Sequence, residues 1–289
     1  MPRPAAQSVA VGAVAPPAAE SVAASATVMP SPPTLTFTPL TARTHSTTSE
    51  RGWWGRTFDK VSGDYAEFYD SGTLLALGTG VGLGAIGANT SFDRDVRDGV
   101  QNHWRSKSTD DVGKVATHFG DGEVLLPVYA LSAFAGPLLG SDVVGEWGER
   151  SLRAMAVATP MLLALQRATG GSRPADPLNN HESKWVFLDS SHGVSGHATV
   201  GAITFLSMAK QTESPVLDAL LYTASALPAL ARVQADRHYA SQALMGWLLG
   251  YLATEAVDDN EAAMRQRRST TWMPVVDGTT VGFAVVHRF

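Results

Sequence analysis

The stretch HGVSGHATVGAITFLSMA, residues 192–209, gives the strongest indication of a fold in this sequence. Ser195 and Gly196 stand before His197, and the apolar residues that follow recur at the spacing of an α-helix. Serine is a preferred N-cap residue, and the first turn of a helix offers backbone N–H groups and a positive dipole end to an anion. The stretch therefore predicts a buried helix that begins with a histidine beside an anion-binding end.

Other long apolar stretches predict further helices, because they exceed the usual length of a strand and are rich in alanine and leucine. They lie at residues 71–92, 124–141, 154–166, 219–231 and 239–254. Together with the stretch above, they predict an all-α bundle of about six core helices. A membrane span needs about 20 predominantly apolar residues, and several of these stretches are shorter. We therefore expect a soluble bundle, with a polytopic membrane protein as the alternative.

Composition and charge limit the partners of this chain. Hydrophobic residues make up 44% of the 289 residues and charged residues only 17%, which predicts a large core in one large domain or two small ones. The net charge of −5 gives no basic surface for nucleic acid, so we expect no such partner. The absence of cysteine excludes disulfides and thiolate metal sites. Catalysis would therefore fall to His, Arg, Ser, Asp and Glu.

The two ends of the chain are predicted to lie outside the bundle. Residues 1–50 are rich in Ala, Ser, Thr and Pro and contain no continuous apolar segment of signal-peptide length. They predict a disordered low-complexity leader, with a processed export segment as the alternative. Near the other end, Asp277-Gly278 stands between alternating apolar residues and predicts a β-hairpin. We expect three parts: the leader, a helical domain at 51–268 and a hairpin appendage at 269–289.

Two further motifs supply the groups that an oxyanion site needs. Arg173 precedes Pro174, and Arg232 is followed six residues later by His238. An arginine offers a planar fork that matches the oxygens of a phosphate. Two histidines can divide the chemistry near neutral pH, because one attacks phosphorus while the other protonates the leaving oxygen. With His197 as the second histidine, these residues point to phosphoryl-transfer chemistry around one hollow.

The order and spacing of the three motifs resemble the type 2 phosphatidic acid phosphatase (PAP2) superfamily, which also contains bacterial acid phosphatases and vanadium haloperoxidases. The family pattern is Lys-x6-Arg-Pro, then Pro-Ser-Gly-His, then Ser-Arg-x5-His-x3-Asp. This chain reads Gln166-x6-Arg173-Pro174, then Val194-Ser195-Gly196-His197, then Ala231-Arg232-x5-His238-x3-Gln242. The resemblance covers about residues 120–255.

The resemblance implies a helical bundle with the site between helices and a phosphatase that needs no metal ion or other cofactor. It implies that His238 is the nucleophile that forms a phosphohistidine, and that His197 is the acid for the leaving alkoxide. It also implies a set of groups around the phosphoryl oxygens: Arg173, Arg232, Ser195, the Gly196 backbone and Gln166.

Two positions of this set depart from the family pattern. Gln166 replaces the lysine and removes a positive charge, although its amide N–H still donates a hydrogen bond. Gln242 replaces the aspartate that orients the nucleophile; its carbonyl holds the same histidine tautomer but does not stabilise an imidazolium. Asp236 offers a carboxylate in the preceding turn and is a candidate to compensate. Because the other phosphate-contacting residues are all present, we expect an active or weakly active enzyme.

Three functions are compatible with the resemblance. The first is a phosphatase for a phosphate monoester, either a lipid phosphate or a small soluble ester, with vanadate as a phosphate mimic. The second is a haloperoxidase with vanadate as its cofactor, against which the missing lysine counts. The third is a catalytically weakened phosphate- or lipid-binding protein. We expect a periplasmic or secreted protein, free or at a membrane surface, of undetermined oligomeric state. Candidates to line the substrate entrance are His181, Glu182 and His192.

Overall fold

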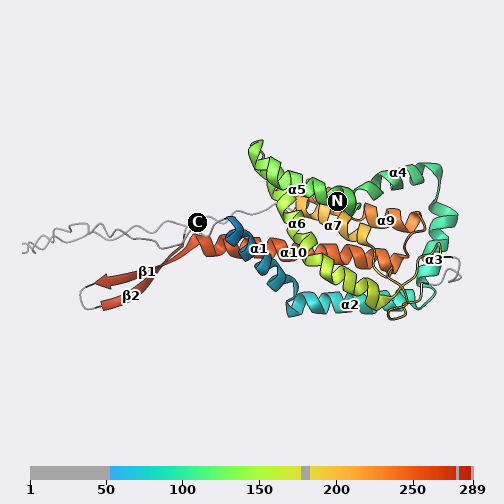
Figure 1. Cartoon of the computed structure of the whole chain (residues 1–289), viewed down its shortest axis with the longest axis horizontal. Coiled ribbons are helices and arrows are strands. Elements are labelled where there is room, and N and C mark those ends of the chain that lie inside the picture. Colours follow the sequence, from blue (N-terminus) through green and yellow to red (C-terminus); the bar gives the residue numbers. More distant parts are fainter. Residues whose placement is uncertain (1–52, 177–182, 278–279, 288–289) are drawn as a thin grey trace, which may run out of the picture. The chain divides into compact units, whose positions relative to one another are not determined.

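The structure is a computed structural model that describes residues 53–176, 183–277 and 280–287. In chain order the elements are α1 (Trp53–Phe68), α2 (Ser71–Ala88), α3 (Phe92–Gly99), the π-helical segment η1 (Val100–Trp104), α4 (Lys107–His118), α5 (Gly122–Leu138), α6 (Asp142–Thr169), α7 (Gly196–Ala209), α8 (Pro215–Ser225), α9 (Leu227–Gln234), α10 (Ala240–Ser269), β1 (Thr270–Asp277) and β2 (Thr280–His287) (Figure 1). The predicted all-α fold class is confirmed for the bundle, whereas the predicted leader lies outside the described residues.

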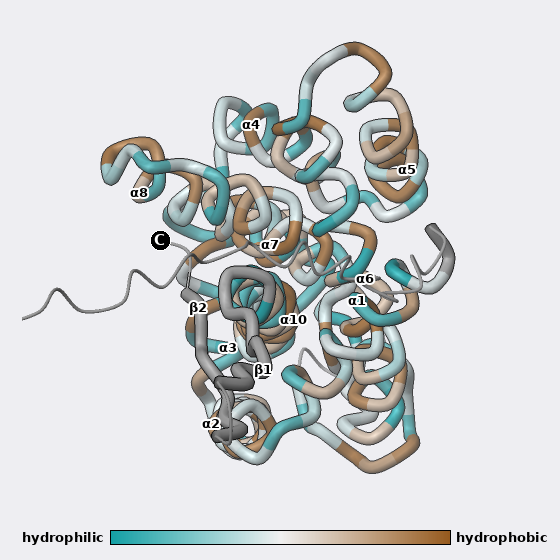
Figure 2. Tube along the Cα trace, turned by 90° about the vertical axis from the view of Figure 1, so that its left-hand side faces the viewer, coloured by the Kyte–Doolittle hydropathy of each residue, from teal (hydrophilic) through white to brown (hydrophobic). Residues whose placement is uncertain are grey.

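The central helix of the bundle is α10, which contacts α1, α2, α6, α7 and α9 (Figures 1 and 2). The side chain of Leu249 in α10 is fully buried. Two glycines let the backbone of α10 lie directly against α7, because a Cβ at Gly246 would clash with the Ser195 carbonyl and one at Gly250 with the Thr199 carbonyl. This close packing fixes the beginning of α7 beside the first turns of α10.

The helix α6 begins at Asp142, whereas the apolar pattern predicts a helix only from residue 154. The buried face of its first half is charged, since Arg150 and Arg153 are each only 4% exposed. Apolar periodicity cannot detect a helix whose inward side chains are paired ions. The prediction was therefore wrong in its starting point, because the core at this end of the bundle is built from ion pairs.

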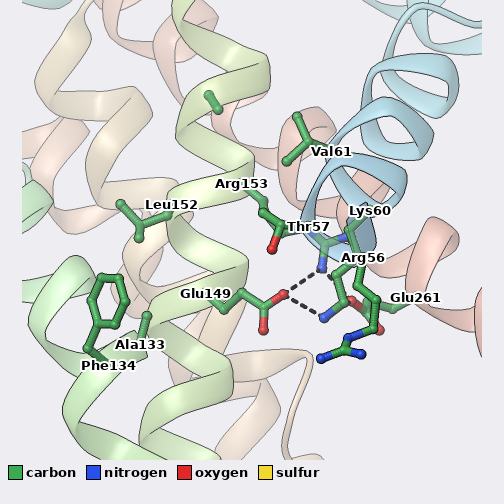
Figure 3. Close-up of a pocket in the computed structure, with 11 residues that line it drawn as sticks. Arg56, Thr57, Lys60, Val61, Ala133, Phe134, Glu149, Leu152, Arg153 and Glu261 are labelled. Carbon is green, nitrogen blue, oxygen red and sulfur yellow. Dashed lines mark hydrogen bonds and ion pairs between the residues drawn. The ribbon is translucent and has the colours of Figure 1, made fainter. Parts of the chain in front are cut away.

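A network of charges joins α1, α6 and α10 at that end of the bundle (Figure 3). Arg153 donates to both carboxylate oxygens of Asp64 at 2.7 and 2.6 Å, and also pairs with Glu261. Lys60 lies 2.5 Å from Glu149 and 3.3 Å from Glu261. A cavity of about 630 Å³ adjoins these residues. Because Lys60 and Arg153 already face carboxylates, its wall does not resemble an oxyanion site.

The apolar stretch predicted as one helix at residues 219–231 is divided into α8 and α9. The division falls at Ala226, whose N–H bonds back to the Thr223 carbonyl at 3.2 Å. Pro228 follows in the first turn of α9, where its missing N–H is tolerated because first-turn donors have no partner inside the helix. Helix α9 contacts α4 and α7 and has Arg232 in its last turn.

The strands β1 and β2 pair in antiparallel register, with Thr270 opposite His287 and Asp277 opposite Thr280. They follow α10 directly in the chain. Residues 278–279, which form the predicted turn, lie outside the described residues. The hairpin at the end of the chain therefore stays a prediction.

Much of the apolar surface of the bundle faces outward. Two helical segments are long and apolar enough to cross a membrane, Ser71–Ala88 with 22% of its residues buried and Pro215–Gln234 with 33%. Hydrophobic segments also appear on the outer turns of α5 and α8 in Figure 2. The most exposed large side chains on these helices are Leu75, Leu83, Ile86, Leu131, Phe134, Leu138, Val216 and Leu220. Exposed apolar surface of this extent is typical of contact with lipid or with another protein.

Candidate active site

The residues of the three motifs lie where α6, α7, α9 and α10 end or begin, at the end of the bundle away from the charge network. Hydrogen bonds join these segments to one another. The Ser195 N–H donates to the Gln242 carbonyl at 3.0 Å, which joins α7 to α10. The Gln166 amide donates to the Val194 carbonyl at 3.0 Å, which joins α6 to α7. The Gln242 amide donates to the Ser172 carbonyl at 2.8 Å, which holds the segment that carries Arg173.

The beginning of α7 has the geometry of an N-cap, as the sequence predicts. Ser195 is fully buried and extended, with φ −80° and ψ 111°, and its hydroxyl accepts from the Ala198 N–H at 3.3 Å. Among the described residues, a Cβ added to Gly196 would have only Leu162 and Gln166 within 4 Å, at 3.8 and 4.0 Å. The backbone at Gly196 is therefore open to an approaching anion, with the Gln166 amide next to it.

His238 is buried and bound to Gln242, whose carboxamide oxygen lies 3.0 Å from Nδ1. That oxygen also accepts from the Tyr239 N–H at 3.1 Å, while the Gln242 nitrogen donates to the Ser172 carbonyl. These two backbone contacts fix which end of the amide is the oxygen. Nδ1 of His238 must therefore carry the proton, and Nε2 keeps its lone pair. This is the tautomer that a nucleophilic histidine needs.

Asp236 does not compensate for the missing aspartate. Both of its carboxylate oxygens accept from Arg97 of α3, each at 2.6 Å. The candidate role of Asp236 in orienting the nucleophile is therefore not supported, because that carboxylate forms a bidentate ion pair with Arg97. The ring of His238 is oriented by a neutral amide.

The electrostatics of the site favour an anion. The pKa of His238 is lowered to about 3, chiefly by burial; Arg232, Arg173 and His192 act in the same direction, while the hydrogen bond to Gln242 opposes them. Burial also lowers the pKa of Arg232, with Arg237 and Arg173 acting in the same direction. The Nε of Arg232 is buried and finds no acceptor among the described residues. An anion placed among these groups would relieve the crowding of positive charge.

His197 in the first turn of α7 belongs to the same electrostatic cluster. Burial lowers its pKa, Arg232 and Arg173 lower it as well, and Asp121 raises it. Asp121 comes close because Gly120 packs on the backbone of His197, where a Cβ would clash with the carbonyl oxygen. The structure thus brings both histidines within the influence of the same two arginines.

The candidate entrance residues are only partly described. Burial lowers the pKa of His192, and Arg173 lowers it too, whereas Asp176 raises it. Since His192 in turn acts on His238, it lies at the border of the cluster. His181 and Glu182 lie outside the described residues. Within the described residues, no group of three or more His, Cys, Asp or Glu is arranged to hold a metal ion.

Sequence reasoning missed three residues around the site: Asp93, Arg97 and Asp121. The first two reach the site from α3, far from their partners in the chain. Asp121 caps α5 through the Glu123 N–H at 3.0 Å, which is a signal for a helix start and not for a site. No pattern in the sequence distinguishes these carboxylates and this arginine from other polar residues between helices.

No family model and no curated protein matches the sequence. Two solved structures are similar in fold, each with 17% sequence identity. The crystal structure of Aquifex aeolicus LpxE covers 59% of this chain and 96% of its own, with a TM-score of 0.44. The crystal structure of the first transmembrane PAP2 type phosphatidylglycerolphosphate phosphatase from Bacillus subtilis covers 73% of this chain and 96% of its own, with a TM-score of 0.49.

Proposed function

We propose that this chain is a PAP2-type phosphatase that hydrolyses a phosphate monoester through a phosphohistidine on His238. The observation that carries the proposal is the fixed tautomer of His238, whose Nδ1 donates to Gln242 so that Nε2 is free to attack. The two arginines that act on this ring, Arg173 and Arg232, are the charges that would hold a phosphoryl group.

Binding of the phosphate would use the open backbone at the start of α7 together with the two guanidinium groups. Ser195 holds the turn as its N-cap, so its contribution to binding comes chiefly through the geometry of the following N–H groups. Gln166 lies beside Gly196 and braces the Val194 carbonyl. It supports the anion site with a neutral hydrogen bond where the family has a charge.

The reaction would proceed in two steps, and the proton that His197 gives up in the first step is regained in the second. In the first, Nε2 of His238 forms a bond to phosphorus, the bond to the ester oxygen breaks, and His197 gives its proton to that oxygen. In the second, water attacks phosphorus while His197 takes a proton from the water, and the bond from phosphorus to Nε2 breaks. A bound phosphate dianion offsets the arginines and raises the pKa of His197, so that the ring is protonated when the ester is present.

Hydrolysis of p-nitrophenyl phosphate by the full chain tests this proposal. We expect turnover by the wild type, none by His238→Ala, and wild-type turnover by His103→Ala, which removes an exposed histidine of η1. Equal turnover by wild type and His238→Ala contradicts a phosphohistidine on that residue. Halide oxidation after vanadate loading distinguishes the haloperoxidase, which the neutral Gln166 disfavours.

The outward apolar surface supports membrane association and, with it, a lipid phosphate as the substrate class. Membranes from cells that make the protein, washed with salt and then with alkaline buffer, test this part. Retention in the membrane pellet until detergent is added supports it, and release into the wash contradicts it. A periplasmic or secreted location stays a prediction.

A further inference from the structure

Two side chains of helix α3 bind the short segment that carries His238. Arg97 donates from Nε and Nη2 to the two carboxylate oxygens of Asp236, each at 2.6 Å. Asp93, which is 1% exposed, accepts from the Ser241 N–H at 2.8 Å and from the Ser241 hydroxyl at 2.5 Å. One contact precedes the histidine in the chain and the other follows it.

The first contact holds a tight turn. Asp236 has φ 57°, in the left-handed region that, apart from glycine, mainly Asn and Asp adopt. The turn then closes on the end of α9, since the N–H groups of Arg237 and His238 both donate to the Arg232 carbonyl, at 3.0 and 3.2 Å. The conformation of this turn therefore sets how the nucleophile lies relative to the phosphate-binding Arg232.

The second contact caps α10 from outside. Ser241 lies in the first turn of α10, where backbone N–H groups have no partner within the helix. The carboxylate of Asp93 provides that partner and, in addition, accepts from the Ser183 hydroxyl at 2.5 Å. The first turn of α10, which includes Gln242, is thereby fixed to α3 and to the segment that leads to His192.

We propose that α3 is a positioning element for the nucleophile: Arg97 acts on His238 through Asp236, and Asp93 acts on it through Ser241. Neither residue touches the substrate in this proposal, which rests on the proposed role of His238. An attacking atom that is displaced by about 1 Å can slow a reaction by about 10²-fold. Loss of these contacts between α3 and the segment that carries His238 is therefore expected to lower kcat much more than it changes KM.

The test uses Arg97→Ala, Asp236→Asn and the double variant that combines these two changes. The control is Arg94→Ala, which removes an exposed arginine from the same helix. Asparagine tolerates the left-handed conformation, so Asp236→Asn removes the charge without adding backbone strain. We expect kcat with p-nitrophenyl phosphate to fall about tenfold or more in both single variants, with KM nearly unchanged. The kcat of the double variant should be no lower than that of the slower single variant, because the two residues act as one unit. Arg97→Lys, which keeps the charge without the bidentate geometry, should be intermediate.

A second measurement, ¹⁵N NMR of the His238 ring, does not depend on activity. We expect the wild type to show a protonated Nδ1 and a bare Nε2, and Arg97→Ala to alter this signal while Arg94→Ala preserves it. Wild-type kcat together with an unchanged ring signal in Arg97→Ala overturns the proposal. If the wild type hydrolyses no ester but Arg97→Ala still alters the ring signal, the proposed function fails and the positioning by α3 stands. Should Arg97→Ala fail to fold, Arg97→Lys and Asp236→Asn are judged by the same two measurements.

Discussion

The carboxamide oxygen of Gln242 lies 3.0 Å from Nδ1 of His238 and accepts a hydrogen bond from the Nδ1–H group. Because the other end of the amide is held by the Ser172 carbonyl at 2.8 Å, the oxygen cannot be exchanged for the nitrogen without losing that bond. In the proposed mechanism, a neutral residue thus performs the orienting half of the role of the aspartate in the PAP2 motif pattern. It leaves the other half, stabilisation of an imidazolium, undone.

The first prediction concerns this orientation. Gln242→Leu keeps the approximate volume of the side chain but removes the acceptor for Nδ1, so His238 can adopt the tautomer in which Nε2 is blocked by its proton. A lost hydrogen bond of this kind costs about 1 kcal/mol or more, and we expect kcat to fall about fivefold or more. Steady-state kinetics with p-nitrophenyl phosphate provide the measurement. A kcat equal to that of the wild type would show that Gln242 does not orient the nucleophile.

The second prediction concerns the acid side of the pH profile. The nucleophile must be neutral, and burial holds the pKa of His238 at about 3, so activity should persist until the pH falls toward that value. Gln242→Asp places a carboxylate beside the ring, which raises the pKa of His238. The loss of activity on acidification should then begin at a higher pH than in the wild type. Profiles of kcat/KM for both proteins with the same ester test this, and coincident acid limbs would contradict it.

The third prediction concerns the alkaline side. Asp121 raises the pKa of His197 against the lowering by burial, Arg232 and Arg173. Asp121→Asn removes that support, so the pKa of His197 falls and a smaller fraction of the acid is protonated at any given pH. The descending limb of kcat/KM should move to lower pH, whereas Glu123→Gln, an exposed neighbour on α5, should leave it in place. An unshifted limb in Asp121→Asn would remove this carboxylate from the mechanism.

The sequence predicts the parts of the fold and the site that depend on local patterns. The N-cap at Ser195 is one such pattern, because its hydroxyl bonds only three residues away. The charged face of α6 does not follow from a local pattern, because Arg153 pairs with Asp64 in another helix. The ion pair between Arg97 and Asp236 cannot be predicted from the sequence either, since no local pattern around one residue indicates the other as its partner. Motif spacing can name the residues of a site, but their orientation follows from contacts that only the fold creates.

The fourth prediction concerns stability at the other end of the bundle. Arg153→Ala leaves Asp64, which is fully buried, without its main counter-charge. Removal of one partner from a buried ion pair typically costs about 3–5 kcal/mol. Thermal unfolding followed by circular dichroism should show a much lower midpoint, while Lys107→Ala, from an exposed pair with Asp111 on α4, should leave the midpoint unchanged. Comparable midpoints for the two variants would mean that the network contributes little to the fold.

The last prediction concerns the missing charge at Gln166. Its amide holds the Val194 carbonyl and lies next to Gly196, where the phosphate is proposed to bind. Gln166→Lys keeps a donor for that carbonyl and adds a positive charge beside the anion, and a charge-assisted hydrogen bond is about twice as strong as a neutral one.

We expect the inhibition constant of inorganic phosphate to fall by about tenfold, which corresponds to about 1.4 kcal/mol. Ala168→Lys is the matched control, because it adds the same charge at an exposed position two residues further along α6. If both lysines lower the inhibition constant equally, the effect is one of net charge, and the Gln166 position does not face the phosphate. If only Gln166→Lys does so, the glutamine marks a weakened anion site in which the motif geometry is otherwise intact.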